Sequence, residues 1–191
     1  MNQEDITEAR AAFFGFNEVM KGWVNTFEGI GLNVVPVTLT GLDLTADGLR
    51  RHEQVIKENS QETTFIMNTH DGLNSRGFKH FEEAANNDNV GEIFADQLSN
   101  TYIICTNIDG VRNKDGQIIR NFNNLDQLNN IEFWGASNNG KGGMETKLWS
   151  AIRFALSKKS RVTYIVDGRM DAVLLRVLLY GEELGTKVQF T

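Results

Sequence analysis

Apolar residues recur along the chain in two patterns, one with a spacing of three to four residues and one of short apolar runs. The first pattern predicts helices over about 6–29, 45–59, 89–98, 144–156 and 171–180. The second predicts strands over 34–40, 63–68, 101–107, 161–167 and 186–190. The run over 101–107 is continuously apolar through its middle, which is typical of a parallel strand buried on both faces.

Strands and helices alternate, so the pattern predicts an α/β protein, a three-layer α/β/α arrangement with a largely parallel central sheet. In the helix over 45–59 we expect Leu49 and Ile56 to point inward, together with either His52 or Val55. Pro36 predicts that its strand lies where no neighbour needs its amide. A hairpin is expected over 111–120, whereas 69–85 and 121–139 show no clear periodicity. The first helix should turn one apolar face inward, made of Ala12, Phe13, Phe16, Met20, Val24 and Phe27.

The most informative stretch is glycine-rich and leads directly into a helix. It reads Gly140-Lys141-Gly142-Gly143-Met144-Glu145-Thr146-Lys147. Glycines let a ligand approach the backbone, and a helix N-terminus offers unpaired N–H groups at a positive dipole end. The stretch therefore predicts the nucleotide-phosphate loop of a small-molecule kinase. The helix should bury one face, made of Met144, Leu148, Ile152 and Leu156.

Two other interpretations of this stretch are possible. It could be only a flexible connection between a strand and a helix, because glycine loops are common. It could also be a P-loop, since residues 135–141 spell G-x-x-x-x-G-K. However, Gly142 stands where a P-loop needs a Ser or Thr to hold magnesium, so we reject that interpretation.

Polar side chains follow several of the predicted strands. In open α/β sheets, ligands bind beyond the carboxyl ends of the strands. Asn and Asp are also common turn and cap residues, so each one alone has a structural explanation. Several such polar segments together with Lys147 at one end of the sheet predict a ligand-binding site. The segments are Asn68-Thr69-His70-Asp71, Asn87-Asp88-Asn89, Thr106-Asn107-Ile108-Asp109-Gly110 and Asp167-Gly168-Arg169.

These segments, in this order, resemble the signatures of the amino-acid kinase superfamily. The closest resemblance is to the glutamate 5-kinases, which catalyse the first step of proline biosynthesis; acetylglutamate kinases are similar in the glycine loop and in Asp167-Gly168-Arg169. The similarity extends over nearly the whole chain from about Ala9. It implies one domain over 1–191, with an acceptor part over 1–100 and a nucleotide part over 101–191.

The resemblance also implies roles for individual residues. Lys147 would neutralise charge on the transferring phosphoryl group, and Asp88 would orient the lysine. Asn68, Asp71 and Asn87 would contact the amino-acid substrate, most simply glutamate. ATP, with Mg²⁺ bound through its oxygens, would lie on residues from two loops, which are Thr106, Asn107, Gly140, Lys141, Gly142, Gly143, Met144 and Thr146. No residue is expected to bind a metal directly, and His52, His70 and His80 lack metal-ligand spacing.

The sequence departs from the family pattern in two places. No K-x-G-G or K-x-G-T precedes the first helix, so the fold is expected to lack the family's first strands, and Asn107 stands where an aspartate is usual. Three hypotheses follow: a kinase completed by a second chain, a degenerate protein that binds nucleotide or amino acid without turnover, and a structural relic. Strand edges left open would favour a homo-oligomer.

Composition and charge narrow the possible partners and the cellular location of the protein. The 191-residue chain has a net charge of −6 and no basic patch, which argues against nucleic acid and anionic membranes as partners. Cys105 is the only cysteine, so no disulfide can form within the chain. With a polar N-terminus that does not resemble a signal peptide, this predicts a cytoplasmic protein.

Overall fold

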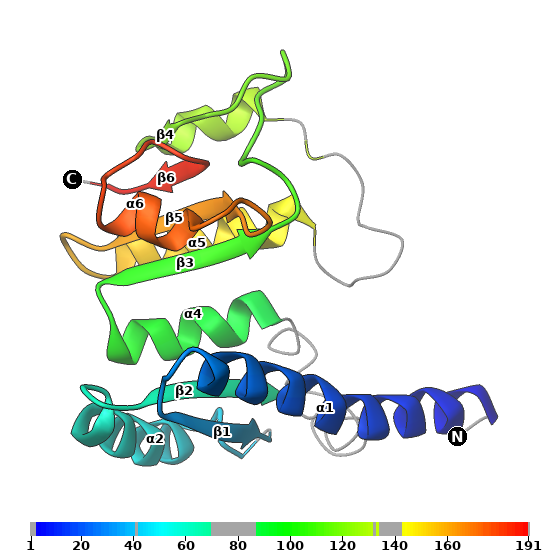
Figure 1. Cartoon of the computed structure of the whole chain (residues 1–191). Coiled ribbons are helices and arrows are strands. Elements are labelled where there is room, and N and C mark those ends of the chain that lie inside the picture. The colour runs from blue at the N-terminus through cyan, green and yellow to red at the C-terminus, as the bar shows by residue number, and fades with distance from the viewer. Residues whose placement is uncertain (1–2, 41, 70–86, 132, 134–142, 191) are drawn as a thin grey trace. The chain divides into compact units, whose positions relative to one another are not determined.

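The protein is described from a computed structural model, in which residues 3–40, 42–69, 87–131, 133 and 143–190 are described, with side chains from residue 15 onward (Figure 1). The chain forms two compact units, Met1–Asn87 and Asp88–Thr191. Both contain parallel strands connected through helices, which confirms the predicted α/β class. The units are described separately below.

The first unit is a pair of parallel strands with two helices. It contains α1 (Gln3–Gly29), β1 (Val34–Leu39), α2 (Ala46–Asn59) and β2 (Thr64–Thr69). β1 and β2 pair in register from Val34 opposite Thr64 to Leu39 opposite Thr69. Among the described residues β2 is the only neighbour of β1, so Pro36 lies in a strand with one unpaired edge, as predicted.

The inward face of α2 contains His52 and not Val55. Ile56 is buried as predicted, and Leu49 is half-buried, whereas Val55 is 53% exposed. His52 Nε2 lies 2.9 Å from Asp43 Oδ1, so its polar ring is satisfied inside the unit. A polar partner can therefore place a histidine where an apolar residue would be expected.

Helix α1 turns its predicted face inward. Met20 is buried, and Phe16, Val24 and Phe27 are half-buried. The side chains of Ala12 and Phe13 lie outside the described residues. Trp23 is 53% exposed and stacks on Phe27, with ring centroids 5.9 Å apart.

The second unit contains the larger sheet. Its strands run β3-β5-β6-β4 across the sheet. β3 and β5 are parallel, β4 and β6 are parallel, and β5 and β6 are antiparallel. The elements in chain order are α4 (Asn87–Leu98), β3 (Thr101–Thr106), β4 (Asn121–Phe122), η2 (Leu125–Asn130), α5 (Met144–Ser157), β5 (Val162–Asp167), α6 (Val173–Leu178) and β6 (Thr186–Val188).

Helices cover both faces of this sheet, which gives the second unit the predicted three layers (Figure 1). Successive side chains of a strand point to opposite faces. Ile165 accordingly packs in the core with α5, and its neighbour Val166 packs with α6. The α5 residues of the first core are Leu148, Ala151, Ile152 and Ala155, and the α6 residues of the second are Val173 and Val177.

Two predictions about burial were wrong. The first was that the run over 101–107 forms a strand buried on both faces. Within the second unit, β3 pairs with β5 alone among the described residues. Only Ile104 of this strand is buried, and Cys105 is exposed. Leu156, expected on the inner face of α5, is 51% exposed, and Phe154 is buried in its place. Phe154 contacts the Tyr102 ring edge-on at a centroid distance of 5.7 Å. The sequence pattern cannot distinguish these neighbouring helix positions, because the outcome depends on which ring is nearby.

The hairpin over 111–120 is confirmed by bridges between Arg112 and Ile118 and a turn closed by the Asn113 N–H on Gln117 O, at 2.9 Å. The following segment, where no pattern was seen, contains β4 and η2. A capping box of Asn124 and Gln127 starts η2. That pair, three residues apart, was the signal available in the sequence.

No helix among the described residues is long and apolar enough to cross a membrane.

Gly91 provides a stability test of the contact between α4 and β3. A Cβ at Gly91 would lie 2.6 Å from the Tyr102 hydroxyl oxygen, which donates a 3.0 Å hydrogen bond to Asp88 O. We expect Gly91→Ala to lower the free energy of unfolding by about 1–3 kcal/mol, because displacement of the ring outweighs alanine's helix propensity. Urea unfolding followed by circular dichroism measures the change.

Gly22→Ala is the matched control. Gly22 also lies inside a helix, α1, and a Cβ there meets nothing within 4 Å. This variant should raise stability by about 0.5–1 kcal/mol. Equal effects of the two substitutions would contradict the steric explanation.

Candidate active site

Lys147 and Asp88 form an ion pair in the second unit. The Lys147 Nζ atom lies 2.9 Å from Asp88 Oδ2 and 3.1 Å from Asp88 Oδ1. Both side chains are largely buried, with 21% and 12% of their surface exposed. Buried charges are stable in proteins when they are paired. The structure therefore places in direct contact two residues that the sequence predicted to work together.

The start of α5 carries the lysine. Gly143 is the N-cap, in an extended conformation and without a side-chain hydrogen bond to the first turn. Lys147 N donates to Gly143 O at 3.4 Å, and Thr146 Oγ1 donates to the same oxygen at 2.8 Å. A helix that begins this way leaves its first amides for an outside acceptor, and its dipole favours an anion there.

The start of α4 carries the aspartate and is held by β3. The Tyr102 hydroxyl donates to Asp88 O at 3.0 Å, so the backbone that carries the carboxylate is anchored to the sheet. Burial, with the charges of Asp88 and Glu92, raises the pKa of Tyr102 well above its usual range. The hydroxyl thus stays protonated and keeps its role as a donor.

Thr106 and Asp167 end adjacent parallel strands. They are register partners, and Gly168 N donates to Thr106 O at 2.9 Å. Asn107 follows directly and is exposed. The carboxyl ends of β3 and β5 therefore bring three polar residues together, which is the placement expected for a ligand site in an α/β unit.

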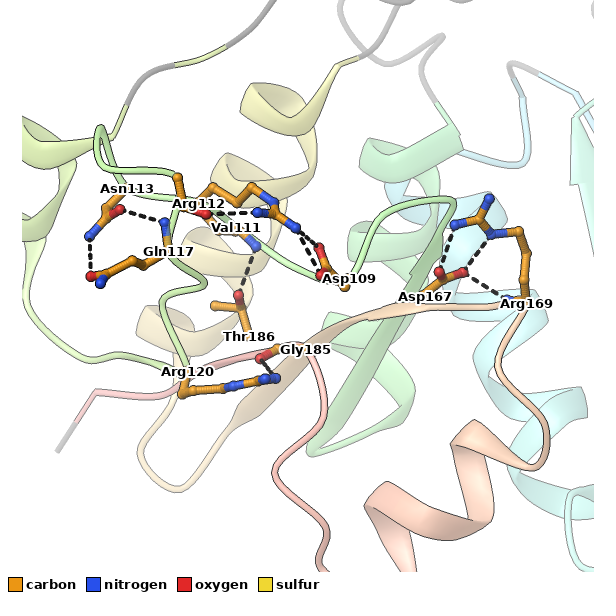
Figure 2. A network of polar contacts seen from close by, with 11 residues as sticks. Asp109, Val111, Arg112, Asn113, Gln117, Arg120, Asp167, Arg169, Gly185 and Thr186 are labelled. Carbon is orange, nitrogen blue, oxygen red and sulfur yellow. Dashed lines mark hydrogen bonds and ion pairs between the residues drawn. The ribbon is translucent and has the colours of Figure 1, made fainter.

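Arg169 folds back onto Asp167 at this edge (Figure 2). Its Nε lies 2.9 Å from Asp167 Oδ1 and its Nη2 2.7 Å from Oδ2, and the Arg169 N–H donates to Oδ1 at 3.0 Å. The side-chain hydrogen bond from Arg169 is the main cause that lowers the pKa of Asp167 to about 2, with its backbone hydrogen bond next. Asp167 is therefore a carboxylate at any physiological pH.

The loop after β3 is fixed to β6 (Figure 2). Val111 N donates to Thr186 Oγ1 at 2.8 Å, and Arg112 Nη2 contacts both oxygens of Asp109 at 2.9 Å. Gly185 has a φ of +69°, and a Cβ there would lie 2.1 Å from Ile165 O, so only glycine fits. These contacts hold the loop that follows Asn107 in one conformation.

The predicted substrate-binding residues belong to the first unit. Asn68 lies next to the end of β2 and is half-buried, and Thr69 Oγ1 donates to Asn87 Oδ1 at 3.3 Å. The structure thus places Asn87 beside the end of β2. Asp71, Gly140, Lys141 and Gly142 lie outside the described residues, so their predicted roles stay predictions.

Among the described residues, no group of three or more His, Cys, Asp or Glu side chains could hold a metal ion.

The far end of α4 forms an ion pair with a residue just beyond the end of α5, a contact that the sequence did not predict. Arg161, only 2% exposed, is paired with Asp96 and hydrogen-bonded to Ser157. Its guanidinium carbon lies 4.7 Å from the centre of the Phe154 ring, and its Nε has no hydrogen-bond partner among the described residues. The available signal was the spacing of Asp88, Glu92 and Asp96, which puts three carboxylates on one face of α4.

Comparison with known families now adds to this geometry. Residues 3–167 match the model of the amino acid kinase family. Because the match covers most of the chain, the protein belongs to the amino acid kinase family, a family of phosphotransferases that act on an amino acid or another carboxylate. A search of curated proteins finds no match to this chain.

Asp96 makes the folded state sensitive to acid. Burial acts to raise the pKa of Asp96, but hydrogen bonds from Ser157 and Arg161 and the Arg161 charge outweigh it and lower the pKa overall. A lowered folded pKa stabilises the protein above the unfolded pKa of about 4, and the gain is lost as the pH falls through the folded value. Asp96→Asn should lower the free energy of unfolding at pH 7 by about 1–3 kcal/mol, because it leaves Arg161 unpaired.

Urea unfolding of wild type and Asp96→Asn between pH 2 and pH 7 measures this difference. It should be largest at pH 7 and shrink below about pH 4. Asp115→Asn, at an exposed turn position, is the control and should change little. A difference that does not depend on pH would rule out the ionised Asp96 as its source.

Proposed function

We propose that the protein transfers the γ-phosphoryl group of ATP to the side-chain carboxylate of an amino acid, with glutamate as the first substrate to test. A carboxylate oxygen would bond to phosphorus as the bond from phosphorus to the ADP oxygen breaks, giving an acyl phosphate and ADP. Such a reaction is the glutamate 5-kinase step of proline biosynthesis. The observation that carries the proposal is the buried contact of Lys147 with Asp88 at the start of α5.

The residues present fit a triphosphate. The first amides of α5 and the Lys147 ammonium together supply hydrogen-bond donors and positive charge at one place. Phosphoryl transfer depends mainly on positioning and on neutralising charge, and both can come from these groups. When bound, Mg²⁺ would neutralise further charge on the phosphate oxygens, and ATP itself would carry it.

Asp88 has a supporting role in this scheme. Its two oxygens hold the Lys147 ammonium in one place, so the lysine does not have to be ordered when the phosphoryl group arrives. Thr106 and Asn107 at the end of β3 would line the nucleotide, and Asn68 and Asn87 in the first unit would contact the amino acid. These four assignments rest on the resemblance. Thr106, Asn107 and Asn68 also lie at or next to strand ends, and Asn87 accepts a hydrogen bond from Thr69 at the end of β2.

The test is ADP release from ATP–Mg²⁺ with glutamate, N-acetylglutamate or aspartate, together with trapping of the acyl phosphate by hydroxylamine. Lys147→Met should lower kcat by on the order of 10²–10³-fold, as loss of one charge-stabilising group does elsewhere. Lys159→Met is the matched control, because Lys159 is an exposed lysine in the turn that follows α5.

The outcomes separate the candidate functions. Turnover that survives in Lys147→Met would refute the assigned role of this lysine. Tight binding of ATP–Mg²⁺ without turnover of any of the three acceptors would favour the binding-only alternative, which the amide of Asn107 in place of a carboxylate also favours.

A further inference from the structure

Helices α4 and α5 face each other through a row of polar contacts, here called the polar ladder. It has three rungs. The first joins Asp88 to Lys147, the second joins Asn89 and Glu92 to Ser150 and Arg153, and the third joins Asp96 to Ser157 and Arg161. Residues three or four apart lie on one face of a helix, so each helix uses a single side for the ladder.

The middle rung centres on one guanidinium. Arg153 Nε lies 2.9 Å from Glu92 Oε2 and 3.1 Å from Oε1, and Arg153 Nη2 lies 2.8 Å from Asn89 Oδ1. Ser150 Oγ also donates to Asn89 Oδ1, at 3.1 Å. A planar guanidinium fixes direction as well as distance, because its donors form a rigid fork.

The position of this rung links it to the candidate active site. Asn89 directly follows Asp88, and Glu92 lies four residues beyond Asp88, about 6 Å along the axis of α4. A shift of α4 along α5 that separates Asp88 from Lys147 would also break the contacts of Arg153. The buried apolar residues of α4, Val90 and Phe94, also resist such a shift by packing, but their contacts specify direction less sharply than hydrogen bonds do.

The two side chains of the middle rung differ in burial. The Arg153 side chain is 48% exposed, but that of Glu92 is only 16% exposed, so the carboxylate depends on the guanidinium for its partner. An isolated exposed ion pair stabilises a protein little. The contribution of this rung is therefore expected in the geometry of α4 more than in overall stability.

We infer that Arg153 and Glu92 are positioning residues: their contact helps to hold α4 at the height along α5 where the Asp88 carboxylate meets the Lys147 ammonium. The Tyr102 hydrogen bond to Asp88 O and the pair of Asp96 with Arg161 act on the same helix. This inference rests on the proposed function for its effect on rate. Neither residue touches the reacting groups in this scheme. Their loss should act through the pairing of Lys147 with Asp88.

Arg153→Gln is the main test variant, and it is read out in two ways. The first is the ¹H–¹⁵N NMR signal of the Lys147 side-chain ammonium, which a persistent ion pair protects from rapid exchange. This signal should be present in wild type and lost in Arg153→Gln. The second is steady-state kinetics, where kcat should fall by about 10- to 100-fold while the KM for ATP changes by less than about twofold.

Three further variants complete the test. Arg153→Lys keeps the charge but not the fork, so it should give an intermediate effect. Glu92→Gln keeps the size of the side chain and should reproduce the loss even if Arg153→Gln folds poorly. Arg176→Gln is the matched control: Arg176 pairs with Glu182 in the same unit, at 2.7 Å, and both residues lie outside α4 and α5.

The inference is overturned if the ammonium signal and kcat of both Arg153→Gln and Glu92→Gln equal those of wild type, or if Arg176→Gln lowers them as much. A wild-type protein that transfers no phosphate would overturn the proposed function instead. The ammonium signal would then still decide whether Arg153 positions the ion pair.

Discussion

The ion pair of Lys147 and Asp88 joins two helices that are far apart in the sequence, and the arrangement of the second unit around it follows from a simple constraint. Two charges that are mostly removed from water must have each other as partners, because an unpaired charge there would be strongly unfavourable. The helix starts that carry them must therefore be held in place. Gly143, at the cap of α5, and Tyr102, bonded to the backbone of Asp88, act on the two sides of the pair.

Helix α5 has an apolar side that packs on the sheet and a polar side that contacts α4. One side, with Leu148 and Ile152, is packed into the core of the sheet and fixes the helix to the strands. The other, with Ser150 and Arg153, carries hydrogen bonds to α4. The apolar side supplies most of the stability, because burial of apolar area is the dominant favourable term in folding. The polar side supplies direction, because hydrogen bonds between side chains constrain orientation as well as distance.

The second unit contains two ion pairs with different roles, one at the strand ends and one at the far end of α4. At the strand ends, the exposed Arg169 pairs with Asp167 within one turn, which keeps a carboxylate ionised beside Thr106 without binding elements together. At the far end of α4, the buried Arg161 joins α4 to the segment that leads into β5. The first pair is a local contact within one turn, whereas the second joins separate elements and is structural, because the Arg161 side chain has almost no contact with solvent.

Much of this protein could be predicted from its amino-acid sequence. The α/β class, most helices and strands and the glycine-capped start of α5 follow from local patterns, since periodicity and capping are properties of neighbouring residues. The family followed from the resemblance of several motifs in order, and the family match agrees with it. Only the tertiary structure decided that His52 and not Val55 lies on the inward face of α2, that Leu156 is exposed and that Asp96 pairs with Arg161. These outcomes depend on partners distant in the sequence, and periodicity carries no information about which distant side chain will be near.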